Sequence, residues 1–391
     1  MYNILIIGGG PAGSAAGISL VRMGYRPIIF ERGNSNRIKV CGDGIAPDSK
    51  RALEQLEVFE YVKSRALEIP RTTIFGHGNT RFDIENKFYT LCRSELDQIL
   101  RDEVERLGGK IHYGAELTDV ATSDNNVKVR DKKGNEFYGD CLILATGFNV
   151  KLAEQLGFEF GDINAYALRG YSPNSQKIDS YMVWFNELLA PGYGWIFPTP
   201  NNQLNFGVVF FKEYQSNGKL PQLKKSFEEI ARMSGYDVNF GGVNTGAGLR
   251  TGLRKDSLSS NRVLLVGENI HTTYNLIGEG IGKALESGII AAETIAESQG
   301  DYSKQSLLGY DAKIRARMQL MHTGYTKATK MISNPVLNLL FTQLLHRSEA
   351  TRKSLQAIIE EESTPERLFS ISRLPRTQLE APSFQHQPSS P

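Results

Sequence analysis

Short apolar runs and a helical pattern alternate at the start of the chain. Residues 2–7 form an apolar run rich in β-branched side chains, and residues 14–23 carry small and apolar side chains at helical spacing. A second apolar run covers 26–30 and ends at Glu31. Runs of this length, bounded by glycines, are typical of buried parallel strands joined by a helix. The pattern predicts an α/β fold whose parallel sheet begins at the N-terminus.

The turn between the first strand and the helix reads Gly-Gly-Gly-Pro-Ala-Gly at residues 8–13. Gly8 permits a tight turn, Gly10 lets the backbone approach a pyrophosphate, and Gly13 lets the helix pack closely on the sheet. The helix N-terminus then presents free N–H groups to phosphates. Glu31 ends the second strand, where a carboxylate accepts hydrogen bonds from a ribose diol. This Rossmann-type arrangement predicts dinucleotide binding; a purely structural βαβ turn is the alternative.

Later segments extend the pattern. Residues 141–147 form a buried strand that ends in Ala-Thr-Gly, and 262–266 form another, followed by Gly267 and Glu268. Residues 275–281 then open a helix that runs to about 298. Between 160 and 260, alternating apolar and polar positions predict strands of a mixed or antiparallel sheet.

Composition narrows the class of protein. The chain has 391 residues, with 40% apolar and 23% charged side chains, as expected for a globular protein of two or three domains. Its 45 basic and 43 acidic residues argue against nucleic-acid binding. Three cysteines (Cys41, Cys92 and Cys141) do not form a disulfide framework, so a reducing cytoplasm is the expected location. The six histidines show no metal-ligand spacing, so no metal is expected.

Taken in order, these segments resemble the FAD-dependent oxidoreductases typified by p-hydroxybenzoate hydroxylase. The resemblance implies FAD as cofactor. It also implies that Arg93 points at the flavin, that the backbone of Leu117 meets the adenine, and that Glu268 stands where the family has an aspartate for the ribityl chain. The residues expected to bind FAD are Gly8, Gly10, Pro11, Ala12, Gly13, Glu31, Arg32, Gly42, Arg93, Leu117, Thr146, Gly147, Gly267, Glu268, Gly278, Gly280 and Ile281.

Two motifs are similar to the geranylgeranyl reductase family within that group. They are Tyr-Gly-Trp-Ile-Phe-Pro at residues 193–198 and Cys-Gly-Asp at 41–43. The resemblance implies transfer of a hydride from reduced flavin to a carbon–carbon double bond of an isoprenoid-like or other apolar substrate. Cys41, Tyr193 and Trp195 are the expected catalytic residues, with a low-pKa thiolate at Cys41. A simple core face for the two aromatic residues is the other interpretation.

Other reactions stay open. The same fold supports monooxygenation through a flavin peroxide and, with a poorer motif match, halogenation; a non-catalytic flavoprotein is a third alternative. His271 follows Gly267 closely and is a further catalytic candidate. No second GxGxxG unit is visible, so NAD(P)H binds transiently or a protein donor supplies the electrons.

The expected organisation is discontinuous. Residues 1–75, 90–160 and 261–300 form the FAD-binding domain, 76–89 and 161–260 the substrate-binding sheet, 301–370 a helical region and 371–391 a disordered tail. Pro335 opens the apolar segment 336–345, and basic residues flank it. That segment is either a cap over the substrate site or a surface for peripheral membrane contact. The sequence does not indicate the oligomeric state.

Overall fold

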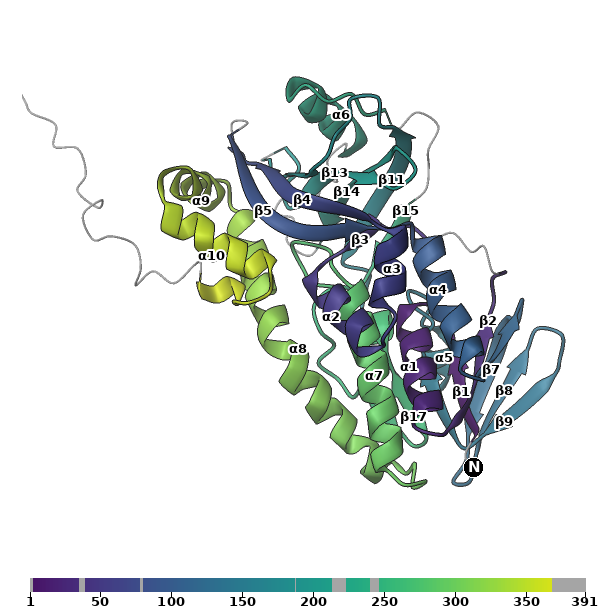
Figure 1. The fold of residues 1–391 in the computed structure, drawn as a ribbon. Helices are drawn as coiled ribbons and strands as arrows, with labels where there is room; N and C mark the ends of the chain where they lie inside the picture. The colour runs from purple at the N-terminus through teal and green to yellow at the C-terminus, as the bar shows by residue number, and fades with distance from the viewer. Residues whose placement is uncertain are drawn as a thin grey trace, which may run out of the picture.

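The computed structural model describes residues 3–34, 39–77, 80–186, 188–212, 223–239 and 246–367. A parallel sheet with helices against it forms one end of the molecule, and a larger sheet forms the other (Figure 1). C-terminal helices lie beside both sheets. The expected tail, 371–391, lies outside the described residues.

The first sheet carries the glycine-rich turn. Within the described residues its strand order is β16-β17-β10-β1-β2-β6. Its strands are β1 (Asn3–Ile7), β2 (Arg26–Glu31), β6 (Lys110–Tyr113), β10 (Cys141–Leu144), β16 (Ser259–Ser260) and β17 (Val263–Leu265). All pair in parallel except β16, which is antiparallel to β17. The predicted parallel sheet is confirmed.

This sheet is covered on both faces because its strands are apolar on both faces. Ile4, Leu5 and Ile6 of β1 are fully buried. Three helices lie on one side, and a three-stranded sheet lies on the other (Figure 1). The helices are α1 (Pro11–Arg22), α4 (Arg93–Arg106) and α7 (Ile281–Glu297); the strands are β7 (Leu117–Thr122), β8 (Val127–Asp131) and β9 (Glu136–Gly139).

A close helix crossing brings two helix N-termini to the same place. A Cβ at Gly288 of α7 would lie 2.1 Å from the carbonyl oxygen of Ala12 in α1. Only glycine allows this approach of α7 to α1. Because both helices begin near the ends of parallel strands, their first turns face one region beside β1 and β17.

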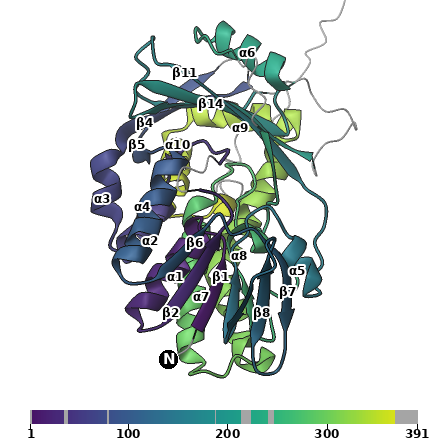
Figure 2. The ribbon, with the colours of Figure 1, turned by 90° about the vertical axis from the view of Figure 1, so that its right-hand side faces the viewer.

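The second sheet forms the roof of the molecule (Figure 2). Within the described residues its strand order is β15-β11-β14-β13-β12-β4-β5-β3. Its strands are β3 (Gly44–Ile45), β4 (Leu67–Phe75), β5 (Arg81–Thr90), β11 (Ala165–Pro173), β12 (Tyr181–Trp184), β13 (Gly192–Thr199), β14 (Gln203–Phe211) and β15 (Gly246–Leu249). The β12–β4 pair is parallel and the other pairs are antiparallel, so the predicted mixed sheet is confirmed. Helix α6 (Leu223–Met233) lies on its outer face, where Phe227 packs against Gly194.

One expected boundary needs correction. Strand β4, assigned above to the FAD-binding domain, pairs with β5 and β12 in the second sheet. Cross-strand pairing, which the local sequence does not encode, decides to which sheet the segment belongs. We therefore propose that the first segment of the FAD-binding domain ends before Leu67 and not at residue 75.

The C-terminal helices close the side of the space between the sheets. The predicted helix at Pro335 is present as α9, and the Asn334 side chain caps it by accepting hydrogen bonds from the N–H groups of Val336 and Leu337. No helix in the described ranges is long and apolar enough to cross a membrane. The remaining elements are α2 (Pro47–Gln55), α3 (Phe59–Arg65), α5 (Lys151–Gln155), α8 (Lys304–Ile332), α9 (Pro335–Arg347), α10 (Glu349–Ile359) and the short 3₁₀ helices η3 (Gly267–Ile270) and η4 (Pro365–Arg367).

Candidate active site

A cavity of about 380 Å³ extends from the glycine-rich turn to the C-terminal helices. The first turns of α1 and α7 line one end, and the inner face of the second sheet forms a wall. Side chains of α8, α9 and α10 line the far end. Most lining side chains are apolar, so the cavity combines a polar, backbone-rich end with a long apolar extension.

The glycine-rich turn leaves room for a phosphate. Gly8 adopts φ +107°, which favours glycine, and a Cβ at Gly13 would lie 1.9 Å from the Gly8 carbonyl oxygen. A Cβ at Gly10, in contrast, would meet nothing within 4 Å. Gly10, Pro11 and Ala12 line the cavity, and α1 has no side-chain cap at its N-terminus. Its free N–H groups are therefore available to an anion.

Glu31 supports this turn from the end of β2. It is 1% exposed, and its carboxylate accepts hydrogen bonds from the N–H groups of Gly9 (2.8 Å) and Gly33 (2.7 Å). The side chain does not line the cavity in the described structure. The expected contact of Glu31 with a ribose stays a prediction, and the structure adds a bracing role for its carboxylate.

Glu268 lies at the cavity wall beside the first turn of α7. Its Oε2 is 3.6 Å from Nζ of Lys39, and its buried Oε1 has no hydrogen-bond partner among the described residues. Gly147 and Gly267 line the same wall, and both have positive φ. The ribityl chain of FAD carries several hydroxyl groups. These can donate to the Oε1 of Glu268, and the glycine backbone without Cβ atoms leaves room for the chain. The residues present therefore fit the predicted cofactor.

The Cys-Gly-Asp loop is held by Asp43, which the sequence analysis did not single out. Asp43 is 1% exposed and adopts φ +62°. Its carboxylate accepts hydrogen bonds from the backbone N–H of Arg93 (3.0 Å), from Nδ2 of Asn205 (2.7 Å) and from the hydroxyl of Tyr171. No local sequence signal marks this role, because Tyr171 and Asn205 are distant in the chain and the positive φ of Asp43 is known only from the structure. The network fixes the loop against β11, β14 and α4.

The expectation of a low-pKa thiolate at Cys41 is wrong. Burial raises the pKa of the Cys41 thiol, and Asp43 raises it further. Arg93 opposes this rise, but its charge is shared with Asp97, which it binds at 2.9 Å. Cys41 therefore carries a neutral thiol at physiological pH, and it lines the cavity with Gly42.

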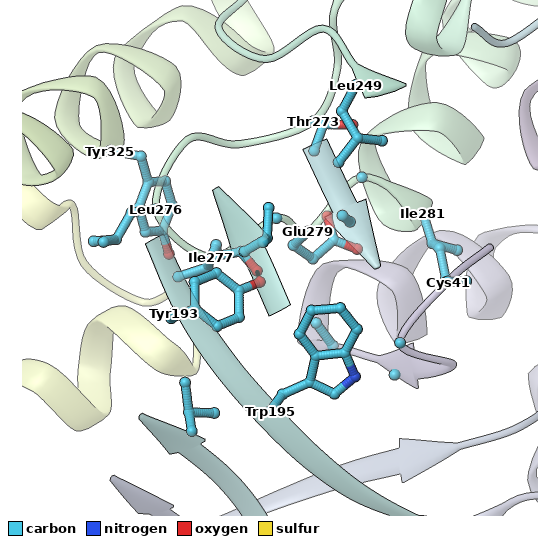
Figure 3. A pocket seen from close by; sticks show the side chains of 18 of the residues that line it. Cys41, Tyr193, Trp195, Leu249, Thr273, Leu276, Ile277, Glu279, Ile281 and Tyr325 are labelled. Atoms are coloured by element: carbon cyan, nitrogen blue, oxygen red, sulfur yellow. Dashed lines mark hydrogen bonds between the residues drawn. The ribbon is translucent and has the colours of Figure 1, made fainter. Parts of the chain in front are cut away.

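An aromatic wall faces Cys41 across the cavity (Figure 3). Tyr193, Trp195 and Phe197 alternate along β13, so all three point to the same side of the sheet and line the cavity. The hydroxyl of Tyr193 donates a hydrogen bond to the carbonyl of Ile277 at 2.5 Å. Nε1 of Trp195 donates to Oδ1 of Asn205 at 3.0 Å. Each ring is thereby held in one orientation.

Several candidates lie elsewhere. Arg32 is exposed, and Leu117 begins β7 outside the cavity lining. Thr146 binds Asn269 through its N–H (3.1 Å). Gly278, Gly280 and Ile281 line the cavity, and their contact with FAD stays a prediction. His271 packs against Phe160 and does not line the cavity; burial lowers its pKa to about 4. The geometry therefore gives His271 no access to a substrate.

Other cavity residues were missed by sequence reasoning. Tyr181, Val183 and Phe185 line the cavity beside β13. The alternation of side chains along β12 was a signal for them, because it places these three positions on one face of the strand. No local sequence signal marks the end of the cavity that the C-terminal helices line, because each helix contributes only a few separate apolar side chains to it. Those residues are Tyr325, Ala328, Ile332, Phe341, Leu345, Leu355 and Ile358. Within the described ranges no group of His, Cys, Asp and Glu side chains is arranged to hold a metal.

The fold and the cavity define a Rossmann-type flavoprotein with a separate substrate sheet. Residues 1–324 match the FAD binding domain family, and the chain belongs to that family. It is an FAD-dependent oxidoreductase. The prediction of FAD as cofactor is confirmed.

Several of the sequence relatives are reductases, and one is a chlorinase from Pseudomonas fluorescens that is 25% identical over 435 residues. A menaquinone reductase of Mycobacterium tuberculosis is 28% identical over 314 residues, which cover 75% of this chain and 76% of that protein. Digeranylgeranylglycerophospholipid reductase 2 of Methanosphaera stadtmanae is 25% identical over 351 residues, covering 84% of this chain and 87% of that protein. The predicted resemblance to the geranylgeranyl reductase family is confirmed.

Solved structures share the fold. A geranylgeranyl bacteriochlorophyll reductase-like protein from Thermoplasma acidophilum superposes with a TM-score of 0.74 at 20% identity, covering 94% of each chain. A flavin-dependent brominase gives 0.73 at 18% identity, covering 94% of this chain and 97% of that chain. Reductases and halogenases therefore share this architecture, and the fold alone does not select the reaction.

Proposed function

We propose that the protein reduces a carbon–carbon double bond in the prenyl chain of a lipid-like substrate. The observation that carries the proposal is the apolar extension of the cavity, which continues from Trp195 past Phe185 to the C-terminal helices. A long apolar channel suits a flexible hydrocarbon chain, since it removes that chain from water. The names of the reductase relatives support the same substrate class.

One set of residues would bind the cofactor, and another would position the substrate. When bound, reduced FAD supplies the hydride. Gly10 and the first turn of α1 would hold its pyrophosphate, and Glu268 its ribityl chain. Tyr193 and Trp195 form the apolar wall that positions the double bond and excludes water.

Anaerobic reoxidation tests this function. We expect the dithionite-reduced flavoprotein to be reoxidised without oxygen by a lipid with geranylgeranyl chains, which has no quinone ring to accept the electrons. The prenyl double bond accepts the electrons, so the product gains two hydrogens. Flavin absorbance and mass spectrometry of the lipid measure both events. Product formation only in air would instead favour a monooxygenase.

Cys41→Ala provides a local control in that assay. The Cys41 thiol is neutral and lines the cavity, so its loss removes packing and leaves the charge unchanged. We expect the variant to keep its FAD and to turn over more slowly by less than about tenfold, a change of less than about 1.4 kcal/mol. A loss of several orders of magnitude would assign the thiol a direct chemical role.

We further propose that α9 docks the protein on an anionic lipid surface. The inward face of α9, with Phe341 and Leu345, lines the cavity. Its outer face presents Val336, Leu337, Leu339 and Leu340, which are 36–65% exposed. The helix contains no acidic residue, and exposed Lys330 and Arg347 flank it. Apolar side chains between cations are typical of helices that lie in a membrane interface.

Vesicle sedimentation tests the docking surface. We expect the protein to sediment with phosphatidylglycerol vesicles and Leu337→Glu/Leu340→Glu to lose most of that binding, because two carboxylates would enter the interface. Leu308→Glu is the matched control, since Leu308 is an exposed leucine near the opposite end of α8. Equal loss in the control, or no sedimentation of the unmodified protein, would refute this proposal.

A further inference from the structure

Glu279 is an acidic side chain that lines the cavity just before α7 begins. It lies between Gly278 and Gly280, and Figure 3 shows it among Tyr193, Trp195 and Ile281. Its Oε1 accepts hydrogen bonds from Oγ of Ser49 (2.9 Å) and from the N–H of Gly282 (3.0 Å). Its Oε2 is buried and has no hydrogen-bond partner within the described ranges. One carboxyl oxygen is thus held in place while the other is left without a donor.

The surroundings favour a protonated carboxyl. Asp48 of α2 is 4% exposed, and its Oδ2 lies 3.6 Å from Nζ of Lys283. Lys283 also forms an ion pair with Glu286 at 3.0 Å, so one positive charge serves both Glu286 and Asp48. Glu361, which follows α10, is a third buried carboxyl group and pairs with Arg51 at 2.6 Å. Several carboxylates close together in an apolar site cannot all stay ionised.

The pKa values follow this arrangement. Burial, and then the charge of Asp48, raises the pKa of Glu279 to about 8. Burial and the same aspartate also raise the pKa of Glu361. Other ionisable groups around the cluster stay neutral. They are the phenols of Tyr193, Tyr274 and Tyr325, and His322 of α8, whose pKa is lowered by burial to about 3. At neutral pH Glu279 is therefore a carboxylic acid with a proton to donate.

We propose that Glu279 is the general acid of the reduction, delivering the proton that adds to the double bond together with the hydride. This assignment rests on the proposed function. Adding hydrogen across a double bond consumes one hydride and one proton: one carbon receives the hydride of the reduced flavin, and its neighbour receives the proton of Glu279. The resulting carboxylate regains a proton from water.

The same cluster offers a route for reprotonation. The hydroxyl of Ser49 touches Glu279 and stands next to Asp48 in α2. Further along α2, Arg51 is half-exposed and binds Glu361. Buried acids thus connect the cavity with the surface, while the apolar wall keeps bulk water from the reacting carbons.

The test compares Glu279→Gln with Glu286→Gln. Glu286 lies on α7, which begins two residues after Glu279, and it binds Lys283, but it does not line the cavity. Both variants are loaded with FAD, reduced with dithionite and mixed anaerobically with a lipid that carries geranylgeranyl chains and no quinone ring. We expect Glu279→Gln to bind FAD normally and to be reoxidised about 10²–10⁴-fold more slowly, the usual contribution of a general acid. Glu286→Gln is expected to keep most of the rate.

Two further readouts separate proton donation from structure. The rate of the unmodified enzyme is expected to fall as the pH rises through about 8, because the acid form disappears, and Glu279→Gln is expected to lose this dependence. Independently of turnover, infrared spectra at neutral pH should show a protonated-carboxyl band that disappears at strongly alkaline pH. Glu361 contributes to this band as well, so Glu279→Gln is expected to lower its intensity. Ferricyanide, an acceptor that takes electrons without a proton, should reoxidise both variants at equal rates.

The outcomes are distinct. Unchanged reoxidation of Glu279→Gln, an equal loss in Glu286→Gln, or a protonated-carboxyl band of unchanged intensity after Glu279→Gln would each overturn the assignment. If the unmodified enzyme is not reoxidised by any prenyl substrate without oxygen, the proposed function fails and the donor role falls with it. The infrared band would still show whether Glu279 is protonated, so the two failures are distinguishable.

Discussion

A Gly10→Val protein is expected to fold normally and to purify without FAD. The backbone of Gly10 is extended, with φ −83° and ψ −174°, and a Cβ there meets nothing within 4 Å. The added side chain therefore costs the fold little. It enters the space that the pyrophosphate backbone contact requires. We expect FAD affinity to fall by about 100-fold or more, about 2.7 kcal/mol, measured by flavin absorbance and by titration of the apoprotein.

Gly13→Val is the matched comparison in the same turn. Its Cβ would lie 1.9 Å from the Gly8 carbonyl oxygen and 3.1 Å from Cβ of Ala145. Overpacking of this kind costs about 1–3 kcal/mol or more, so this variant should unfold at a lower temperature whether or not FAD is present. Full FAD occupancy in Gly10→Val would contradict our assignment of the phosphate site. Equal destabilisation of both variants would show that Gly10 is structural.

The second large effect is expected at the buried ion pair of α4. Arg93 and Asp97 are 5% and 2% exposed, and Nη2 of Arg93 reaches both carboxylate oxygens, at 2.9 and 3.1 Å. Asp97→Ala leaves the guanidinium buried without its partner. Breaking such a pair costs about 3–5 kcal/mol, so we expect the urea midpoint of unfolding to fall sharply. Arg106→Ala, in the exposed pair at the end of the same helix, should leave the urea midpoint almost unchanged, because water screens that guanidinium.

The double variant Arg93→Met/Asp97→Leu separates stability from cofactor binding. Replacing both members of a buried pair by apolar side chains is often neutral for stability. We therefore expect the double variant to regain most of the stability lost in Asp97→Ala. Because Arg93 lines the cavity, the same variant should still bind FAD more weakly. Normal FAD affinity in the double variant would remove Arg93 from the flavin site.

The candidate site shows where sequence reasoning stops. Cys41, Tyr193 and Trp195 were recognised from motifs, and the structure brings all three to one cavity. The direction of the pKa shift of Cys41 was misjudged. That direction depends on burial and on the guanidinium of Arg93, which is 52 positions away in the chain. Asp43 was overlooked as the anchor of the loop because its partners Tyr171 and Asn205 come from the second sheet.

Local patterns determined the βαβ unit, the glycine-rich turn and the capped start of α9, because strand periodicity, glycine geometry and capping act over a few residues. They also indicated FAD and a reductase family. Only the tertiary structure decided that β4 belongs to the second sheet and that C-terminal helices extend the cavity. It alone joined Ser49 to Glu279 and Arg51 to Glu361, pairs separated by 230 and 310 positions. Proton affinity depends on burial and neighbouring charge, and both arise when distant segments pack together.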